Sequence, residues 1–227
     1  MLDWWVVYIY YLVYDNHISS VWPGKVVLVL GRITNLVNEN SFGDNCIAIN
    51  NDCSFLNITG ITCGRGHGIS VGSLGKDGKF ETVEEVHVRN CIFQGTKNGA
   101  RIKTWQGGSG YARKITFEDI ILNGAKNPII IDQNYNDFQR NGPVVKVSDV
   151  TYRNITGTTV FVEAISLNCD PVGCSDIVLD HIDITFASAG KSAQSLCKNV
   201  HGTFTSWVTE LSLPFAPFLV GGRHLLP

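Results

Sequence analysis

A short apolar pattern that returns at nearly regular intervals is the feature that most restricts the fold of this chain. The pattern is apolar-x-apolar-x-x-apolar, and its alternation has the period of two that is typical of a half-buried strand. Successive copies begin 30, 29, 35 and 27 residues apart. The five copies are Leu56-Ile58-Ile61, Val86-Val88-Cys91, Ile115-Phe117-Ile120, Val150-Tyr152-Ile155 and Ile177-Leu179-Ile182.

A second apolar alternation follows each of the first four copies. It is found at Ile69-Val71, Ala100-Ile102 and Ile129-Ile131, and less clearly within residues 160–167. Short strands separated by Gly, Asn and Asp turns can bury an apolar face only by stacking on neighbouring repeats. A β-sandwich also contains many short strands, but it does not predict a shared register between distant repeats. We therefore predict an all-β fold, a right-handed parallel β-helix (β-solenoid).

The same repeats predict the domain organisation. We expect a parallel β-helix domain over residues 31–206, between an irregular apolar N-terminal segment (1–30) and an irregular C-terminal tail (207–227). Residues 4–14 form an aromatic-rich apolar run, which is too short to span a bilayer. This run also lacks the basic start and small-residue cleavage site of a signal peptide. We expect no membrane span, and we expect a monomer.

One polar column within the repeats predicts a stack of tight bends. The residue before the third apolar position is Gly or a polar residue in every copy, and such residues tolerate left-handed backbone. The column consists of Gly60, Asn90, Asp119, Asn154 and His181. Asn154 starts a formal glycosylation sequon, but a place in this stack would occupy its amide. Asn57 starts a second sequon between two inward residues, and whether it carries a glycan is left open.

Charge and cysteine content narrow the function further. Charged residues make up 17% of the chain and the net charge is −2, so no global field attracts nucleic acid or an anionic membrane. Seven cysteines favour an oxidising compartment, although buried thiols in a cytosolic protein are the alternative. Cys169 and Cys174 enclose a short loop that a disulfide could close. No Cys-x-x-Cys pair is present, so we expect no zinc site, no other metal and no cofactor.

Three polar segments fall at nearly the same phase of the repeat. Asp44 precedes His67 by 23 residues, and His67 precedes Arg101 by 34, of which the polar stretch 72–81 takes ten and leaves 24. Adjacent strands lie about 4.8 Å apart, so an acid, an imidazole and the cations Arg101 and Lys103 would share a patch roughly 10 Å long. Such a patch suits an anionic substrate. The alternative is that Arg101-Ile102-Lys103 is an ordinary solvated strand face.

Residues 43–201 resemble the plant polygalacturonases, which are pectin-cleaving glycoside hydrolases with a right-handed parallel β-helix. Four segments carry the resemblance: GDNCIAI (43–49), CGRGHGISVGSLG (63–75), NGARIKTW (98–105) and NPIIIDQNY (127–135). The resemblance implies hydrolysis of α-1,4-galacturonan by an inverting acid/base mechanism, without a cofactor, in the extracellular cell wall. It implies catalytic roles for Asp44, as general acid, and for His67. It implies substrate binding by Arg101, Lys103 and Tyr135, and the disulfides Cys46–Cys63 and Cys169–Cys174.

The sequence departs from the family pattern at two catalytic carboxylates. Asn45 stands where the family has the second Asp of Gly-Asp-Asp, and residues 21–25 (VWPGK) stand about one coil upstream, where the family has Asn-Thr-Asp. An inverting glycosidase needs a second carboxylate as base, and base assistance contributes about 10²–10⁴-fold in rate. We therefore expect weak or no activity.

Three interpretations of the chain remain. The first is a polygalacturonase, and the second is a non-catalytic β-helix that binds polygalacturonate or is an incomplete gene product. A calcium-dependent pectate lyase would need an acidic cluster for the metal, and the predicted site offers one carboxylate. Trp105 and Tyr111 are equally open to sugar stacking and to packing.

Overall fold

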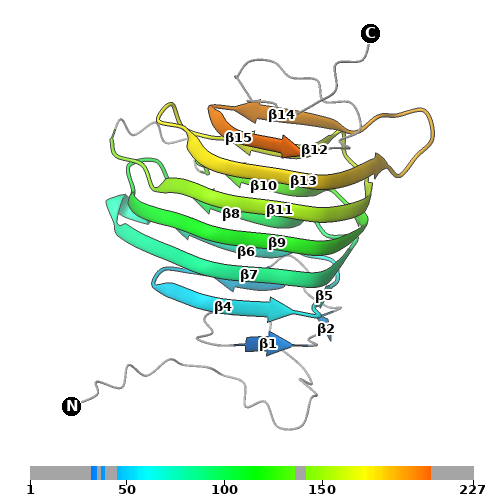
Figure 1. Cartoon of the computed structure of the whole chain (residues 1–227), viewed down its shortest axis with the longest axis horizontal. Coiled ribbons are helices and arrows are strands. Elements are labelled where there is room, and N and C mark those ends of the chain that lie inside the picture. The colour runs from blue at the N-terminus through cyan, green and yellow to red at the C-terminus, as the bar shows by residue number, and fades with distance from the viewer. Residues whose placement is uncertain (1–31, 35–36, 39–44, 136–141, 206–227) are drawn as a thin grey trace.

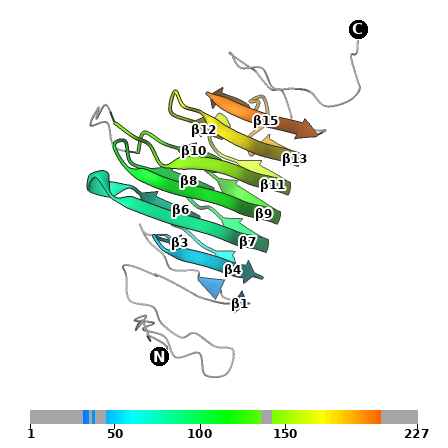
Figure 2. The ribbon, with the colours of Figure 1, turned by 60° about the vertical axis from the view of Figure 1, so that its left-hand side comes forward.

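The computed structural model describes residues 32–34, 37–38, 45–135 and 142–205. Within this part, all strands pair in parallel and form two sheets, which Figures 1 and 2 show as stacked rungs of one solenoid. This confirms the predicted parallel β-helix. The segments 1–30 and 207–227 lie outside the described residues, and the proposed domain boundaries stay a prediction. No helix in the described part is long and apolar enough to cross a membrane.

One sheet has long strands and is called the long sheet below. It consists of β1 (Arg32–Thr34), β2 (Val37–Asn38), β4 (Cys53–Thr59), β5 (Thr62–Cys63), β7 (Phe80–Gln94), β9 (Ser109–Ala125), β11 (Lys146–Thr159), β13 (Cys174–Phe186) and β15 (Val200–Thr205).

The other sheet, called the short sheet, runs in the order β14-β12-β10-β8-β6-β3. Its strands are β3 (Ile47–Ile49), β6 (Ile69–Leu74), β8 (Asn98–Thr104), β10 (Asn127–Asp132), β12 (Glu163–Asn168) and β14 (Gln194–Lys198). A short 3₁₀ turn, η1 (Lys76–Gly78), lies between β6 and β7. Within the polar stretch at 72–81, residues 75–79 therefore carry the chain from the short sheet back to the long one, and the other residues belong to β6 and β7.

The repeated apolar pattern sets the register of the long sheet. Its first positions, Leu56, Val86, Ile115, Val150 and Ile177, pair directly from strand to strand. All five side chains are buried. A shift by one residue would turn each strand's apolar set toward water, which is why the pattern specifies the register so strongly.

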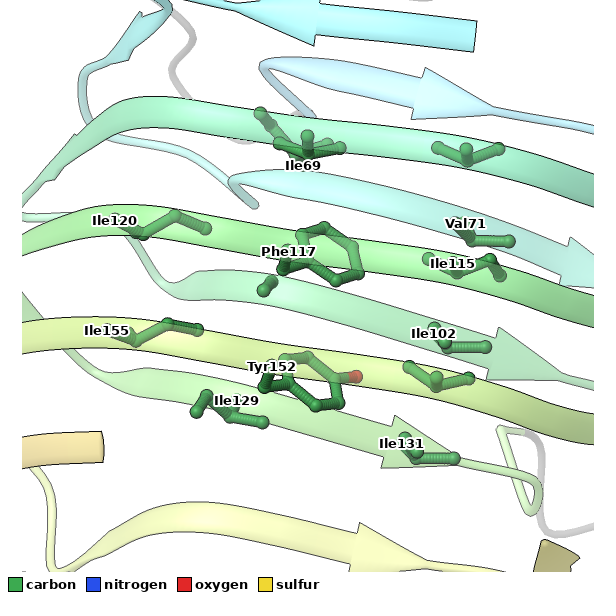
Figure 3. Close-up of a cluster of buried hydrophobic side chains, with 14 of the residues drawn as sticks. Ile69, Val71, Ile102, Ile115, Phe117, Ile120, Ile129, Ile131, Tyr152 and Ile155 are labelled. Carbon is green, nitrogen blue, oxygen red and sulfur yellow. The ribbon is translucent and has the colours of Figure 1, made fainter. Parts of the chain in front are cut away.

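Phe117 and Tyr152 form the centre of the core between the two sheets (Figure 3). Their rings come from β9 and β11 and stack with centroids 5.4 Å apart and planes inclined by 5°. Isoleucines of the short sheet, among them Ile69 and Ile129, belong to the same buried cluster as these rings. The Tyr152 hydroxyl is buried and makes no hydrogen bond in the described part of the chain, and burial raises its pKa.

The predicted column of bends is present. Gly60, Asn90, Asp119, Asn154 and His181 all have left-handed backbone, with φ between 49° and 70°. Asn154 Nδ2 donates to Asp119 Oδ1 at 2.6 Å, so its amide is occupied as expected.

A second left-handed column, which the sequence did not predict, precedes the first apolar position of each repeat. It consists of Phe55, Glu85, Lys114, Asp149 and Asp176, with φ between 53° and 56°. Their mixed residue types hide the requirement, because left-handed backbone is more usual for Gly, Asn and Asp.

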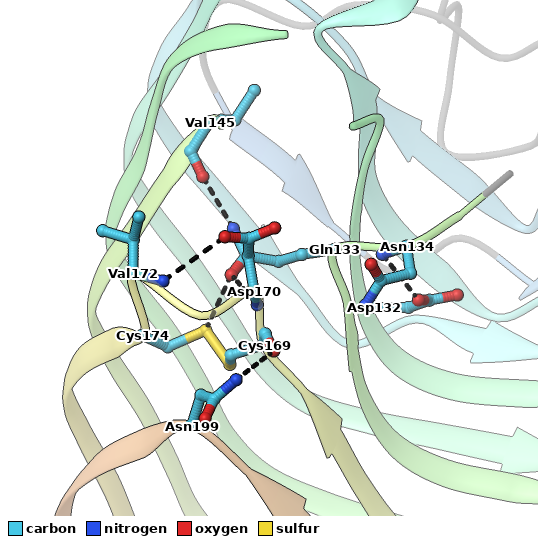
Figure 4. Close-up of a disulfide and its surroundings, with 9 residues drawn as sticks. All are labelled: Asp132, Gln133, Asn134, Val145, Cys169, Asp170, Val172, Cys174 and Asn199. Carbon is cyan, nitrogen blue, oxygen red and sulfur yellow. Dashed lines mark hydrogen bonds between the residues drawn. A yellow bond between two sulfur atoms is a disulfide. The ribbon is translucent and has the colours of Figure 1, made fainter. Parts of the chain in front are cut away.

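Two disulfides join the cysteine pairs that the family resemblance implies. Cys46, before β3, is bonded to Cys63 in β5, and this bond links the two sheets. Cys169–Cys174 closes the loop between β12 and β13 (Figure 4). Gln133 braces this loop, since its Oε1 accepts from the Asp170 amide at 3.0 Å and its Nε2 donates to the Val145 carbonyl at 2.7 Å.

The other three cysteines of the described part, Cys53, Cys91 and Cys197, are buried free thiols. Burial raises the pKa of Cys91 to about 11 and that of Cys197 to about 12. These thiols therefore stay protonated at neutral pH, and they behave as small core residues.

Candidate functional site

The first three rungs of the short sheet bring the predicted site segments together. Strands β3, β6 and β8 are consecutive neighbours, and Ala48, Ser70 and Arg101 occupy one register column. The amide of Cys46 donates to the Gly68 carbonyl at 2.8 Å, which joins the segments that precede β3 and β6.

The structure describes one of the two proposed catalytic residues. His67 precedes β6 at the edge where the site segments meet, and its side chain is half-buried. Asp44 lies outside the described residues, so its place in the site stays a prediction.

Glycine lets the backbone at this edge pack closely. Gly68 has a φ of +62°, and a Cβ there would lie 2.3 Å from the Asn98 carbonyl oxygen. A Cβ on Gly99 would lie equally close, 2.3 Å, to the Pro128 carbonyl oxygen on the next rung. These contacts are backbone to backbone, so no side chain could move aside to make room. The glycines beside His67 and before Arg101 therefore serve the stacking of three rungs.

Arg101 is enclosed and is held by neutral acceptors. Its residue exposure is 8%. The guanidinium donates from Nε to Ser70 Oγ at 2.9 Å and from Nη2 to Asn45 Oδ1 at 2.8 Å. The Asn98 amide, turned with its oxygen toward Arg101, accepts from Nη1 at 2.9 Å. Among the described residues, no carboxylate forms a salt bridge with it.

The electrostatics of Arg101 follow from this enclosure. Burial lowers the pKa of Arg101 from its ordinary value, and nearby Tyr135 and Asp132 oppose the shift. A guanidinium nevertheless keeps its charge in proteins. The result is a buried positive charge surrounded by hydrogen-bond acceptors that do not neutralise it, which is an arrangement suited to an anion.

Lys103 is also enclosed, with 7% exposure. Its Nζ lies 4.7 Å from the centroid of the Tyr135 ring, a cation–π distance. Asp132 occupies the register position opposite Lys103 on β10. Ile102, between the two cations, points into the core, so Arg101 and Lys103 share the outer face of β8, as the alternation predicts. The burial of both cations contradicts the alternative of a solvated strand face.

Trp105 extends the same group of side chains, whereas Tyr111 does not. The Trp105 and Tyr135 rings meet edge to face, with centroids 6.1 Å apart, and Lys76 Nζ lies 5.6 Å from the Trp105 centroid. Tyr111 belongs to β9 of the long sheet, where Arg113 covers its ring at 4.2 Å. Of the two aromatic candidates, only Trp105 lies beside the site.

Residues 32–209 of the chain match glycosyl hydrolases family 28. The chain belongs to this family. It is 49% identical over 201 residues to a probable polygalacturonase of Arabidopsis thaliana, an alignment that covers 83% of this chain and 44% of that relative. It is 42% identical to an exopolygalacturonase of Oenothera organensis, with 74% and 49% covered, and 42% identical to a polygalacturonase of Malus domestica, with 74% and 36% covered.

The family 28 chain thus spans less than half the length of these relatives. Among solved structures, it matches the endo-xylogalacturonan hydrolase from Aspergillus tubingensis with a TM-score of 0.66 and 24% sequence identity. The alignment covers 74% of this chain and 47% of that enzyme. This likeness supports the β-helix fold, and the family resemblance expected from the four sequence segments is confirmed.

Asn45, which the family resemblance predicts to stand at a degenerate catalytic position, makes two hydrogen bonds with Arg101 and the neighbouring Ser70. Its Oδ1 accepts from Arg101 Nη2 and from Ser70 Oγ, the latter at 3.1 Å. A carboxylate at this position could accept the same two hydrogen bonds. The amide therefore preserves the local geometry, and what it lacks is a negative charge and the capacity to take a proton from water.

Two contact residues of the site, Ser70 and Asn98, were missed by the sequence reasoning. Both are small polar residues at the phase of the repeat that faces Arg101, since Ser70 pairs with Arg101 across β6 and β8, and Asn98 lies on β8 itself. A search of the register column through Arg101 would have found Ser70. No charge or motif distinguishes either residue from the polar residues of ordinary turns.

Proposed function

We propose that this family 28 chain binds α-1,4-linked galacturonan of pectin and that its hydrolytic turnover is weak. The observation that supports the proposal best is the pair of enclosed cations on β8, Arg101 at 8% and Lys103 at 7% exposure. Each galacturonate unit carries one carboxylate. The planar fork of Arg101 suits a bidentate contact with it, and Lys103 supplies a point charge beside the Tyr135 ring.

In this proposal, Asp44 would protonate the leaving oxygen and a second carboxylate would take a proton from the attacking water. The two carboxyl groups of an inverting enzyme lie about 6.5–9.5 Å apart. Asn45 can orient a water molecule but cannot accept its proton. His67 would hold Asp44 in its working protonation state or contact the sugar. The described carboxylate on the same face is Asp132, whose Oδ1 accepts from the Asn134 amide at 3.0 Å.

A non-catalytic protein that binds polygalacturonate is the second candidate, and the amide at position 45 favours it. Both candidates use the same cations, so they differ in turnover and not in ligand. The disulfides Cys46–Cys63 and Cys169–Cys174 support an oxidising, extracellular location such as the cell wall for either. We propose a monomer in both cases.

A reducing-sugar assay on polygalacturonate separates the two candidates. We expect negligible turnover for the chain as it stands and a partial gain for Asn45→Asp, with Asp44→Asn in the same background as the control that abolishes the gain. Base assistance is typically worth about 10²–10⁴-fold, and Asn45→Asp restores one of the two missing carboxylates. Turnover of the unsubstituted chain at about 1–10³ per second would place it among ordinary enzymes and refute weak catalysis.

A calorimetric titration with galacturonate oligomers tests binding independently of turnover. Arg101→Ala should weaken binding of the oligomers, whereas Arg113→Ala, which removes an arginine from the long sheet, should leave binding unchanged. Equal affinity of the unsubstituted chain and Arg101→Ala would exclude the cationic site as the place of binding.

A further inference from the structure

We propose that Lys76 and Trp105 form a second uronate-binding position, adjacent to the one at Lys103 and Tyr135. This inference rests on the proposed galacturonan binding and extends it along the polymer. Its basis is a continuous series of contacts in which two aromatic rings touch each other and each ring also contacts one cation. Lys103 Nζ lies 4.7 Å from the Tyr135 centroid, Tyr135 lies 6.1 Å from Trp105, and Trp105 lies 5.6 Å from Lys76 Nζ.

The position of Lys76 is fixed by backbone contacts between two turns. Gly75, with φ of +82°, precedes Lys76, and a Cβ on Gly75 would lie 2.7 Å from Gly108 Cα. A Cβ on Gly108 would in turn lie 2.4 Å from Gly75 Cα. The two glycines therefore allow the η1 turn to pack directly against the turn that follows Trp105.

Hydrogen bonds hold both turns in place. The Trp105 amide donates to the Leu74 carbonyl at 2.8 Å, which ties the start of one turn to the end of β6. The Gly75 amide donates to Glu81 Oε2 at 2.7 Å. Trp105 and Lys76 are thus presented side by side by the backbone, although Lys76 itself is exposed.

The chemistry of this series matches a polymer of sugar acids. Each unit of galacturonan has C–H groups that can pack on an aromatic ring and a carboxylate that can pair with a cation. Lys103 with Tyr135 offers one ring and one charge, and Lys76 with Trp105 offers the same combination again. Two such pairs in contact suit two successive units of one repeating chain better than they suit a single small anion.

Other cation–ring pairs of the described residues lack this continuity. Arg113 over Tyr111 also pairs with Glu84, so its charge is already neutralised by a carboxylate. Lys126 over Phe161 and Lys191 over Phe186 lie in other turns of the solenoid. Of these described pairs, only Lys76–Trp105 makes ring contact with Tyr135, and Tyr135 in turn contacts the enclosed Lys103. Among these pairs, it is the one placed to bind the same ligand.

The test is a calorimetric titration of hexagalacturonate, in its free-acid and fully methyl-esterified forms, into matched lysine variants. Lys76→Gln removes the proposed charge. Lys79→Gln removes an exposed lysine three residues along, outside the aromatic series, and is the control. We expect Lys76→Gln to weaken binding of the free acid about two- to fivefold, which is the size of an ion pair with an exposed lysine. The methyl ester should be unaffected by Lys76→Gln, and Lys79→Gln should change neither titration.

A third variant, Trp105→Leu, separates the ring from the charge. It should weaken binding of both forms of hexagalacturonate, since packing on a ring needs no carboxylate. A thermal melt shows whether the variant is folded. If the unsubstituted chain binds the free acid and Lys76→Gln and Lys79→Gln bind it equally well, the second position is refuted while galacturonan binding stands. If the unsubstituted chain does not bind the free acid, the proposed function itself fails, and the second position with it.

Discussion

The two sheets of the solenoid carry the same kinds of charged side chain in opposite surroundings. On the long sheet, Arg113, Lys114 and Arg153 are about half exposed, and each pairs with a carboxylate on a neighbouring strand. These pairs are Arg113–Glu84, Lys114–Glu85, Arg153–Glu118 and Arg153–Asp180. On the short sheet, Arg101 and Lys103 are enclosed, and they meet amides, a hydroxyl and an aromatic ring.

This difference teaches which charges serve the fold and which serve a ligand. An exposed ion pair gains little, because water already solvates both partners. Arg101, by contrast, has lost water and is hydrogen-bonded by neutral acceptors among the described residues, which compensate its charge incompletely. The long sheet therefore presents paired charges on an exposed face, and the enclosed Arg101 of the short sheet suits the anionic ligand that we propose.

The largest effect is expected where the two sheets share one core. Tyr152→Ala removes a fully buried ring that stacks on Phe117, and such substitutions cost about 3–5 kcal/mol of unfolding free energy. Denaturant unfolding should show this loss, and binding of galacturonate oligomers should fall with the folded fraction.

Tyr152→Phe is the matched control. It keeps the ring and removes a hydroxyl that has no hydrogen-bond partner among the described residues, so stability should stay equal or rise by up to about 1 kcal/mol. A loss of stability in Tyr152→Phe comparable to that in Tyr152→Ala would contradict the packing explanation.

The next effect compares the cations of the two sheets directly. Arg101→Met should weaken binding of galacturonate oligomers about ten- to a hundredfold, since a hydrogen bond to a charged group contributes about 1.5–3 kcal/mol. Its unfolding free energy should change little, because the removal of a desolvated charge offsets the hydrogen bonds that Ser70, Asn45 and Asn98 lose.

Arg113→Met is the control on the long sheet. It should leave binding unchanged and have little effect on stability. If Arg101→Met unfolds the protein while Arg113→Met does not, the enclosed cation serves the structure, and the contrast between the sheets must be reversed.

The sequence predicted most of the fold because one physical requirement repeats five times. Each copy of the apolar pattern must turn the same residues inward, so Leu56, Val86 and Ile115 had to share a column. The second column of left-handed residues was missed, since Phe55 and Lys114 give no sign of the backbone they adopt. Stacking against the neighbouring strand imposes that conformation, and the type of a single residue does not reveal such a tertiary constraint.

The candidate site was only partly predictable. Coil spacing brought Arg101 and Lys103 to the right face, but the spacing left their burial undecided. That burial depends on Ser70, Asn98 and the close backbone contacts at Gly68, which become visible only in three dimensions. Asp44 and its protonation role remain predictions from the family resemblance.

A smaller effect is expected from making the short-sheet site resemble a long-sheet pair. Asn45→Asp would place a carboxylate where Arg101 Nη2 already donates at 2.8 Å. It would neutralise part of the charge that attracts the ligand, so affinity for galacturonate oligomers at neutral pH should fall by about three- to tenfold. The same substitution is expected to raise turnover, so binding and hydrolysis should change in opposite directions. Asn45→Ser, which introduces no charge, is the control for binding, and an unchanged affinity in Asn45→Asp would show that Arg101 does not set it.

The smallest effect belongs to the long sheet and depends on pH. Asp180 accepts from Thr205 Oγ1 and from Arg153 Nε, and it lies beside His181. These contacts hold the pKa of Asp180 below its ordinary value in the folded chain. The unfolded chain then binds the proton more readily than the folded one, so the contribution of Asp180 is complete above about pH 4 and is lost as pH falls through its lowered pKa. Unfolding of Asp180→Asn should therefore depend less steeply on pH below about pH 4. Asp149→Asn, which removes an exposed carboxylate elsewhere on the long sheet, is the control for the loss of one acidic group. Oligomer binding at neutral pH should be the same in both variants, because the charges of the long sheet do not reach the ligand. A change in binding for Asp180→Asn would show that the two faces are electrostatically coupled through the core.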